Sequence, residues 1–509
     1  MTNPLHDALY APLAGQSRAL MHLPGGKALS ADVFHTMVAR AAGALTAAGL
    51  RPGDRLALQV PKSAEALALI GGAIRAGVVF LPLNTAYTAE EVAYFVRDSG
   101  AALLIADPAQ AEALAPVAQA AGARLMTLAL GAAGEGSFAE AMTAAPETAP
   151  VARDVNDLAG LLYTSGTTGR SKGAMLTHGN LLSNAEVLAR AWRFTDRDVL
   201  LHALPVFHTH GLFVATNTVL LTGGAMLLHP GFNLDAVIAD LPRATAMMGV
   251  PTFYTRLLAD PRFTRELVAH MRLFTSGSAP LLAETHEAFH TRTGHRILER
   301  YGMTETNMNT SNPYDGDRRA GTVGLPLAGV EVIVTDPETG TELPQGETGM
   351  IEVRGPNVFA GYWNMPDKTA EEKRANGYFI TGDLGRFDGD GYLHIVGRAK
   401  DLIISGGYNV YPKEVELLLD EAPGVLESAV IGVPHPDFGE AVLGVVVPSE
   451  GAAPDAATLE ALLQDRLARY KQPKAYEILP ALPRNTMGKV QKAELRARFA
   501  QRFTNGGPA

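Results

Sequence analysis

The chain has 509 residues, and single hydrophobic cores stop growing at roughly 250–300 residues, so at least two domains are expected. Apolar residues make up 47% and charged residues 19%, which is typical of a folded protein rather than a disordered one. The 43 basic and 53 acidic side chains give a net charge of −10, which argues against binding to nucleic acid or an anionic membrane. Because cysteine is absent, a disulfide framework, a thiolate metal site and a cysteine nucleophile are excluded.

The N-terminal stretch MTNPLHDALYAPLAG lacks the basic start and apolar run of a secretory signal, so we expect a cytoplasmic protein. Up to about residue 390, helical patterns such as residues 31–50 alternate with short strand-like runs, for example 55–60, 78–83, 102–106 and 225–229. This alternation predicts an α/β fold with layered, mostly parallel sheets. The apolar segment 66–83 is interrupted by Arg75 and by glycines, which favours a buried helix leading into a strand over a membrane span.

Residues 330–355 are richer in strands and turns, so a barrel-like subdomain is expected to begin near residue 325. Beyond Arg398 the pattern changes to a helix and a strand in 412–435, a strand in 441–450 and a helix in 455–470. We therefore predict a large N-terminal domain, residues 1–398, and a small α+β C-terminal domain, residues 399–509.

The segment YTSGTTGRSKG, residues 163–173, combines glycines, hydroxyl side chains and Lys172. Backbone N–H groups of a glycine-rich loop, hydroxyl donors and a lysine together suit a polyphosphate. One alternative is a flexible surface turn. A second is a P-loop, but Gly173 stands where that motif needs a Ser or Thr for Mg²⁺, which weakens the interpretation as a kinase.

Five motifs, YTSGTTGRSKG, RYGMTET, YFITGDLG, GRAKDLIISGG and PRNTMGKVQK, occur in the order and approximate spacing of the adenylate-forming superfamily of acyl-CoA synthetases. The resemblance covers nearly the whole chain. It implies a two-step reaction in which a carboxylate attacks the α-phosphate of ATP and a thiol then attacks the acyl-adenylate. The implied co-substrates are ATP and coenzyme A, and the implied cofactor is Mg²⁺. The resemblance also implies that the C-terminal domain is mobile. No protein partner is expected.

The resemblance also assigns roles to individual residues. It implies that Lys489 bridges the carboxylate and the α-phosphate, and that Glu305, with Thr168, holds the metal. In isolation, Lys489 would be an ordinary exposed lysine, as we expect of Lys492. The implied nucleotide-binding residues are Thr164, Ser165, Gly166, Thr167, Thr168, Gly169, Lys172, Ser278, Ala279, Tyr301, Gly302, Thr304, Asp383 and Arg398.

For the second half-reaction, the resemblance implies a hinge at Lys400, where backbone torsions reorient the small domain. A lysine in a linker would otherwise be solvated surface. The residues implied to line the path of coenzyme A are Ser405, Gly406, Gly407 and Tyr408.

Arg300, directly before Tyr301, departs from the superfamily pattern, in which arginine is unusual there. A buried arginine needs an anionic partner, and a carboxylate matches its geometry, so we predict a second carboxylate on the acid. The segment LPVFHTHGLF, residues 204–213, adds polar side chains to the implied acid pocket, and His208 is the histidine that we favour as catalytic and substrate-binding. The other predicted acid-binding residues are Thr209, Ser278 and Met308.

Within the superfamily, these features resemble the malonyl-CoA synthetases, which implies malonate as the main acid and methylmalonate as a tolerated one. Three alternatives remain at this point. Arg300 could form a surface salt bridge with Glu299 or another carboxylate, the acid could be another small or aryl carboxylic acid, or the chain could be a regulatory protein with an inactive site.

Overall fold

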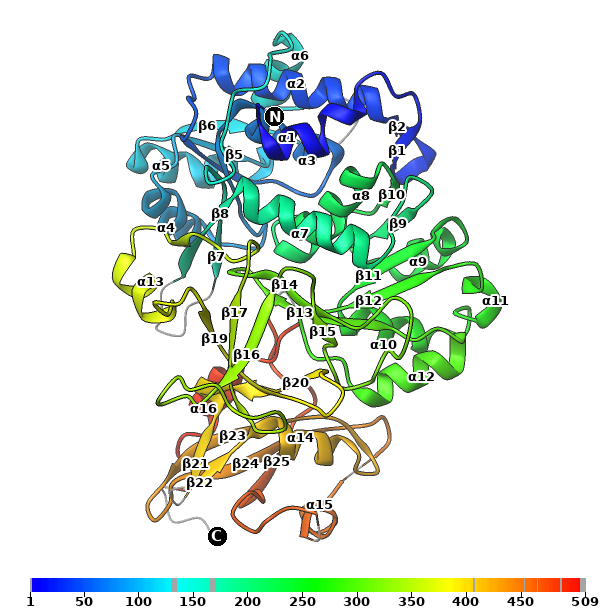
Figure 1. Ribbon diagram of the computed structural model, residues 1–509, viewed down its shortest axis with the longest axis vertical. Helices are drawn as coiled ribbons and strands as arrows, with labels where there is room; N and C mark the ends of the chain where they lie inside the picture. The colour runs from blue at the N-terminus through cyan, green and yellow to red at the C-terminus, as the bar shows by residue number, and fades with distance from the viewer. Residues whose placement is uncertain are drawn as a thin grey trace. The chain divides into compact units, whose positions relative to one another are not determined.

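The structure is a computed structural model that describes residues 2–129, 135–164, 171–405, 408–452, 454–464, 466–485 and 488–503. The chain divides into two compact units (Figure 1): Met1–Val332 with Val353–Phe379, and Ile333–Glu352 with Ile380–Ala509. The domain boundary after Arg398 stays a prediction. Within the described ranges, no helix is both long enough and apolar enough to cross a bilayer.

The first unit contains two large sheets, and most of their strand pairs are parallel. Antiparallel pairing occurs toward the sheet edges, as in β13 with β14 and β7 with β8. The predicted α/β class is therefore confirmed. In spatial order, the nine-stranded sheet is β15 (Leu325–Pro326), β14 (Asn307–Ser311), β13 (Leu298–Met303), β12 (Leu273–Ser276), β11 (Ala246–Gly249), β9 (Val199–His202), β10 (Ala225–Leu228), β1 (Ala19–His22) and β2 (Ala28–Ser30). The seven-stranded sheet is β18 (Gly361–Tyr362), β8 (Lys172–Thr177), β7 (Leu158–Thr164), β4 (Val79–Pro82), β3 (Arg55–Gln59), β5 (Leu103–Ala106) and β6 (Arg124–Thr127).

Helices of the first unit pack on these sheets and on one another, as α2 does on both α3 and α6 (Figure 1). A π-helical turn, η4 (His210–Thr216), leads directly into α8. The helices are α1 (Pro4–Leu9), α2 (Ala31–Ala47), α3 (Ala64–Ala76), α4 (Ala89–Ser99), α5 (Ala111–Ala121), α6 (Ser137–Ala144), α7 (His178–Ala191), α8 (Asn217–Thr222), α9 (Leu234–Asp240), α10 (Pro251–Ala259), α11 (Arg265–Val268), α12 (Ala283–Thr293) and α13 (Pro366–Glu372).

Helix α3 shows how local sequence sets these boundaries. The Ser63 hydroxyl accepts a hydrogen bond from the Ala66 N–H at the N-terminus. Gly77, at φ 70°, ends the helix in the left-handed conformation that glycine adopts without strain. The helix is buried almost throughout and leads into β4, so the segment 66–83 is a core helix and strand, as predicted.

The second unit is built around two smaller sheets and its own hydrophobic clusters. The segment expected to form a barrel-like subdomain forms a four-stranded sheet. Its strands are, in spatial order, β16 (Glu331–Thr335), β17 (Gly349–Arg354), β19 (Phe379–Phe387) and β20 (Leu393–Arg398). The other sheet comprises β22 (Tyr408–Val410), β21 (Ile403–Ser405), β24 (Gly439–Pro448) and β23 (Val425–His435), with β25 (Ala475–Ile478) beside β24. Its helices are α14 (Pro412–Asp420), α15 (Ala456–Gln464) and α16 (Lys492–Phe499).

Candidate active site

Arg300 is a buried cation on β13. The residue is 3% exposed, and burial lowers the pKa of its guanidinium to about 10. Its Nε and Nη2 atoms have no hydrogen-bond partner among the described residues. Because Arg300 is buried, the alternative of a surface salt bridge with Glu299 or another carboxylate is wrong. Leaving a buried charge without a partner is costly, so this position calls for an anion.

Gly277 makes room for this guanidinium. It follows β12, and a Cβ atom at this position would lie 2.3 Å from Arg300 Cζ. The next residue, Ser278, has φ 70°, a left-handed conformation that costs a non-glycine residue about 1–3 kcal/mol and is common at functional sites. Sequence reasoning picked Ser278 and Ala279 from the same motif but missed Gly277, whose only signal was its place between two serines.

The segment after β9 brings a second polar group to Arg300. His210 is buried, and its Nδ1 lies 3.2 Å from the Ser278 hydroxyl. Burial, followed by the positive charge of Arg300, lowers the pKa of His210 well below its ordinary value, so its imidazole is neutral. The buried His210 Nε2 and Thr209 Oγ1 atoms have no hydrogen-bond partner within the described structure.

His208, the histidine favoured from the sequence, is only half-buried, and its Nδ1 accepts the backbone N–H of His210 at 3.3 Å. Its catalytic role stays a prediction. The structure thus adds His210 to the candidate site. His210 differs from His208 in its burial, which the tripeptide sequence HTH does not reveal.

Glu305 lies between two hydroxyl groups. Thr164, at the end of β7, donates to Glu305 Oε1 at 3.3 Å, and the Tyr362 hydroxyl lies 3.1 Å from the same oxygen. The Tyr362 hydroxyl also lies 2.6 Å from Glu372 Oε2. Burial and the two carboxylates raise the pKa of Tyr362 above its ordinary value, so it stays a neutral donor. Neither Tyr362 nor Glu372 was predicted from the sequence.

Lys172, predicted to bind phosphate, is 7% exposed at the start of β8. Its Nζ lies 3.0 Å from Glu372 Oε1 and 4.1 Å from the centre of the Tyr362 ring. The lysine is thus part of the Glu305, Tyr362 and Glu372 cluster. Contact between Lys172 and a phosphate stays a prediction.

The donor set at Glu305 fits Mg²⁺ held jointly with a nucleotide. Among the described residues, no group of three or more His, Cys, Asp or Glu side chains could hold a metal ion. Mg²⁺ is commonly bound by one or two carboxylates together with substrate phosphates and water, so one buried carboxylate is sufficient.

The other predicted residues of the first unit lie on or near the β13–β14 hairpin. Tyr301, Gly302 and Thr304 are half-buried, whereas Met308 is 2% exposed. A Cβ at Gly302 would lie 1.9 Å from the Asn307 carbonyl oxygen, so the close approach of these strands requires glycine. The hairpin therefore brings Arg300, Glu305 and Met308 into one region of the first unit.

Asp383 and Arg398 of the second unit are joined by an ion pair. They face each other across β19 and β20, and Arg398 Nε lies 2.6 Å from Asp383 Oδ1. Lys400, the predicted hinge, is exposed in the short 3₁₀ turn η6 (Ala399–Asp401). The roles of Asp383 and Arg398 with ribose, and of Lys400 as a hinge, stay predictions.

The remaining predicted residues of the second unit differ in exposure. Ser405 is buried at the end of β21, while Tyr408 is 60% exposed with its ring 4.8 Å from that of Tyr470. Lys489 is exposed, and its backbone N–H donates to Asn485 Oδ1 at 3.0 Å. The expectation that Lys492 is an ordinary exposed lysine is wrong, because its Nζ lies 2.5 Å from the buried Glu416 carboxylate.

Seven predicted residues lie outside the described residues: Ser165, Gly166, Thr167, Thr168, Gly169, Gly406 and Gly407. Their assignments stay predictions.

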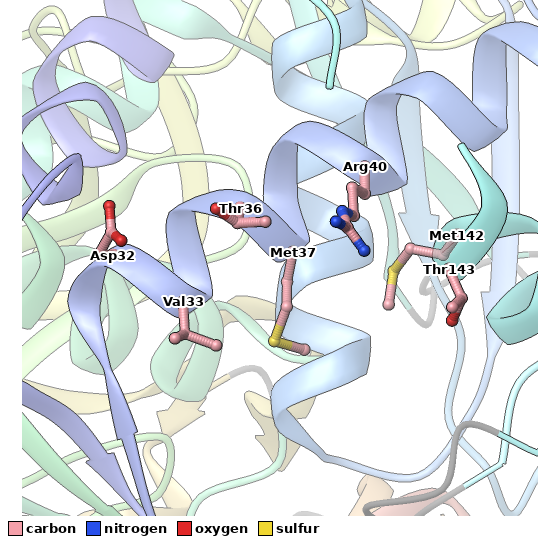
Figure 2. Close-up of a pocket in the computed structure, with 7 residues that line it drawn as sticks. All are labelled: Asp32, Val33, Thr36, Met37, Arg40, Met142 and Thr143. Carbon is pink, nitrogen blue, oxygen red and sulfur yellow. The ribbon is translucent and has the colours of Figure 1, made fainter. Parts of the chain in front are cut away.

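A cavity of about 290 Å³ lies between α2 and α6 (Figure 2). Asp32 and Arg40 at this cavity are exposed, and Val33 is 49% exposed. No predicted site residue is among its lining residues, which are Asp32, Val33, Thr36, Met37, Arg40, Met142 and Thr143.

The chain is similar to known proteins along nearly all of its length. Residues 12–363 match the family model of AMP-binding enzymes, and residues 414–489 match that of the AMP-binding enzyme C-terminal domain. A feruloyl-CoA synthase from an Amycolatopsis species is 41% identical over 494 residues, or 96% of this chain and 97% of the relative. A malonate–CoA ligase from Arabidopsis thaliana is 35% identical over 490 residues, with coverage of 88% and 78%. The crystal structure of ATP-bound MatB from Rhodopseudomonas palustris matches with a TM-score of 0.96 and 53% identity, covering 99% of this chain and 100% of that one.

Proposed function

This chain belongs to the AMP-binding enzyme family and is an AMP-forming acyl-CoA ligase, and we propose that the acid it activates is malonate. The observation that carries the proposal is the buried Arg300 side chain. Its Nε and Nη2 atoms, which have no hydrogen-bond partner in the ranges that the structure describes, form one edge of the guanidinium. Two parallel N–H donors on one edge match the two oxygens of a carboxylate.

In the proposed reaction, one carboxylate of malonate attacks the α-phosphorus of ATP and pyrophosphate leaves. The thiol of coenzyme A then attacks the acyl carbon, and AMP leaves. Arg300 binds the other carboxylate throughout, while Thr209 and His210 offer further buried polar atoms beside it. Met308 borders the second carbon of the acid and limits branching, so methylmalonate is the largest acid that we expect to be accepted.

Both steps develop negative charge on oxygen. We propose that Lys489 stabilises this charge during adenylate formation as a mobile cation. Glu305 would hold Mg²⁺ against the phosphates, where the ion offsets their charge. The Thr164 and Tyr362 hydroxyls fix the orientation of the Glu305 carboxylate.

An aryl acid is the second candidate, because the feruloyl-CoA synthase is 41% identical to this chain. A ring without a second carboxylate would leave Arg300 buried and unpaired, which disfavours this candidate. ATP-dependent thioester formation with malonate, methylmalonate, succinate, acetate, octanoate and ferulate separates the two. We expect the highest kcat/KM with malonate, and a preference for ferulate, acetate or octanoate would contradict the proposal.

Arg300→Ala tests the clamp directly. The variant leaves the second carboxylate of malonate buried without its partner. We therefore expect kcat/KM for malonate to fall roughly 30-fold to several thousand-fold, which corresponds to a loss of about 2–5 kcal/mol in transition-state binding. The KM for ATP should change little. The matched control is Arg296→Ala, because Arg296 is 39% exposed and pairs with Glu287. Equal kinetics of the two variants would place the clamp elsewhere.

A further inference from the structure

A buried lysine lies at the base of the segment that carries the acid-binding residues. Lys62 is 7% exposed and directly precedes the N-cap residue of α3. Among the described residues, no carboxylate lies within salt-bridge distance of its Nζ. The N-terminus of a helix carries partial positive charge, so both burial and the helix dipole oppose a cation here.

Three acceptors surround the Lys62 ammonium group. Its Nζ lies 2.9 Å from His202 Nδ1, 2.7 Å from the His202 carbonyl oxygen and 2.9 Å from the Leu204 carbonyl oxygen. Burial lowers the pKa of Lys62 well below its ordinary value, which disfavours the charged form. The three acceptors oppose this shift, because they match the three protons of an ammonium, whereas a neutral amine would leave one acceptor facing a lone pair. The lysine therefore holds the chain on both sides of Ala203.

His202 extends this network to the far end of the segment. With Nδ1 accepting from Lys62, the proton lies on Nε2, which is 3.0 Å from the Gly211 carbonyl oxygen and 3.0 Å from Thr216 Oγ1. The Thr216 hydroxyl donates to the same Gly211 carbonyl at 2.9 Å. Burial and the charge of Lys62 lower the pKa of His202, which keeps its imidazole neutral.

We call the hydrogen bonds made by Lys62, His202 and Thr216 the loop-base network. This network fixes both ends of residues 203–211. The loop also closes on itself, because a Cβ at Gly211 would lie 2.0 Å from the Pro205 carbonyl oxygen. Between these fixed ends lie the candidate acid-binding residues His208, Thr209 and His210.

We propose that Lys62 is a positioning residue for the acid substrate: through the loop-base network it fixes the 203–211 segment, and so sets the affinity for the acid without touching it. This inference rests on the proposed function, because it takes the 203–211 segment as the wall of the acid pocket. Small displacements of positioning groups are costly, since an error of about 1 Å can reduce rates roughly 100-fold.

Lys62→Met tests the proposal, because methionine keeps an unbranched apolar chain but removes all three donors. We expect the KM for malonate to rise about tenfold or more while the KM for ATP stays within about twofold of wild type. Lys27→Met is the matched control, since Lys27 is exposed. An unchanged malonate KM, or an equal rise of both KM values, would overturn the proposal.

Thr216→Val is the second test. It is the decisive one if circular dichroism shows that Lys62→Met does not fold. It removes the hydroxyl that bonds to the Gly211 carbonyl, so we expect a selective but smaller rise of the malonate KM. A wild-type value for this variant would also count against the network. The wild-type acid panel tests the malonate assignment separately. Should another acid be preferred, the same KM comparison is made with that acid, so failure of one proposal is distinguishable from failure of the other.

Discussion

At the scale of single residues, Arg300 combines a stability cost with the binding role that we propose for it. The guanidinium is buried, its pKa is lowered to about 10, and two of its nitrogen atoms have no hydrogen-bond partner in the described part of the chain. Replacing buried ionic groups by apolar side chains of similar volume is often neutral or stabilising by about 1–4 kcal/mol. In the proposed function, the free energy lost in the ligand-free protein would be recovered when the acid binds.

Arg300→Met is therefore expected to leave the free energy of unfolding of the ligand-free first unit unchanged, or to raise it by about 1–4 kcal/mol. Malonate at about 100 times its Kd should stabilise the wild type by roughly 2.7 kcal/mol and the variant hardly at all. Thermal melts with and without malonate measure both effects. A clear loss of stability in the ligand-free variant would instead identify Arg300 as a structural residue.

At the scale of elements, the β13–β14 hairpin and helix α14 each place a charged group in a low-dielectric environment. The hairpin holds Arg300 and Glu305 five residues apart. On α14, Asp420 is the last helical residue, and Ser428 Oγ on β23 donates to Asp420 Oδ1 at 2.7 Å. Burial raises the pKa of Asp420 from 3.8 to about 6.

This shift makes the stability of the second unit depend on pH. Since the pKa is higher in the folded state, the contribution of Asp420 is fully present below about pH 4 and is lost as the pH rises through about 6. Asp420→Asn removes the charge but keeps an acceptor for Ser428. We expect it to stabilise the unit by on the order of 1–3 kcal/mol at pH 8, and by less at pH 5.

Thermal melts of wild type and Asp420→Asn at the two pH values measure the difference. Asp437→Asn serves as control, because Asp437 is exposed in the same unit. A stabilisation of Asp420→Asn that is the same at pH 5 and pH 8 would show that titration of Asp420 is not its cause.

At the scale of the whole molecule, the sequence predicted what depends on local pattern. Strand and helix alternation predicted the α/β class, and the apolar segment 66–83 predicted α3 and β4. The family motifs indicated Glu305, and a departure from the family pattern indicated Arg300. The structure places Arg300 on β13 and Glu305 two residues beyond its end. These features depend on residue spacing along a single segment, which the sequence shows directly.

What the sequence missed depends on partners far apart in the chain. Tyr362 meets Glu305 from 57 positions away, and Lys62 meets His202 from 140 positions away. Burial separates His210 from His208, although both belong to one tripeptide. Such contacts follow from the tertiary packing of several elements, and no periodicity or motif in one segment specifies them.

The predicted residues also belong to different units: Arg300 and Glu305 to the first, and Lys489 to the second. The family resemblance implies that Lys489 acts only in adenylate formation. Lys489→Ala should therefore reduce malonate-dependent ATP–pyrophosphate exchange by about 100-fold or more, because a cation is lost where charge develops. Thioester formation from preformed malonyl-AMP and coenzyme A should stay within about threefold of wild type on the same reasoning.

The two half-reactions, assayed separately on one preparation, give this comparison directly. Lys471→Ala is the matched control, because Lys471 pairs with Glu414 at 2.7 Å in the same unit and is expected to leave pyrophosphate exchange unchanged. If Lys489→Ala slowed both half-reactions equally, the lysine would have a structural role in the second unit, and its assignment to one chemical step would be wrong. A loss confined to pyrophosphate exchange would indicate that Lys489 acts at the α-phosphate. The exposed lysine would then be needed for one step and dispensable for the other. The complete reaction would therefore require the second unit to be mobile.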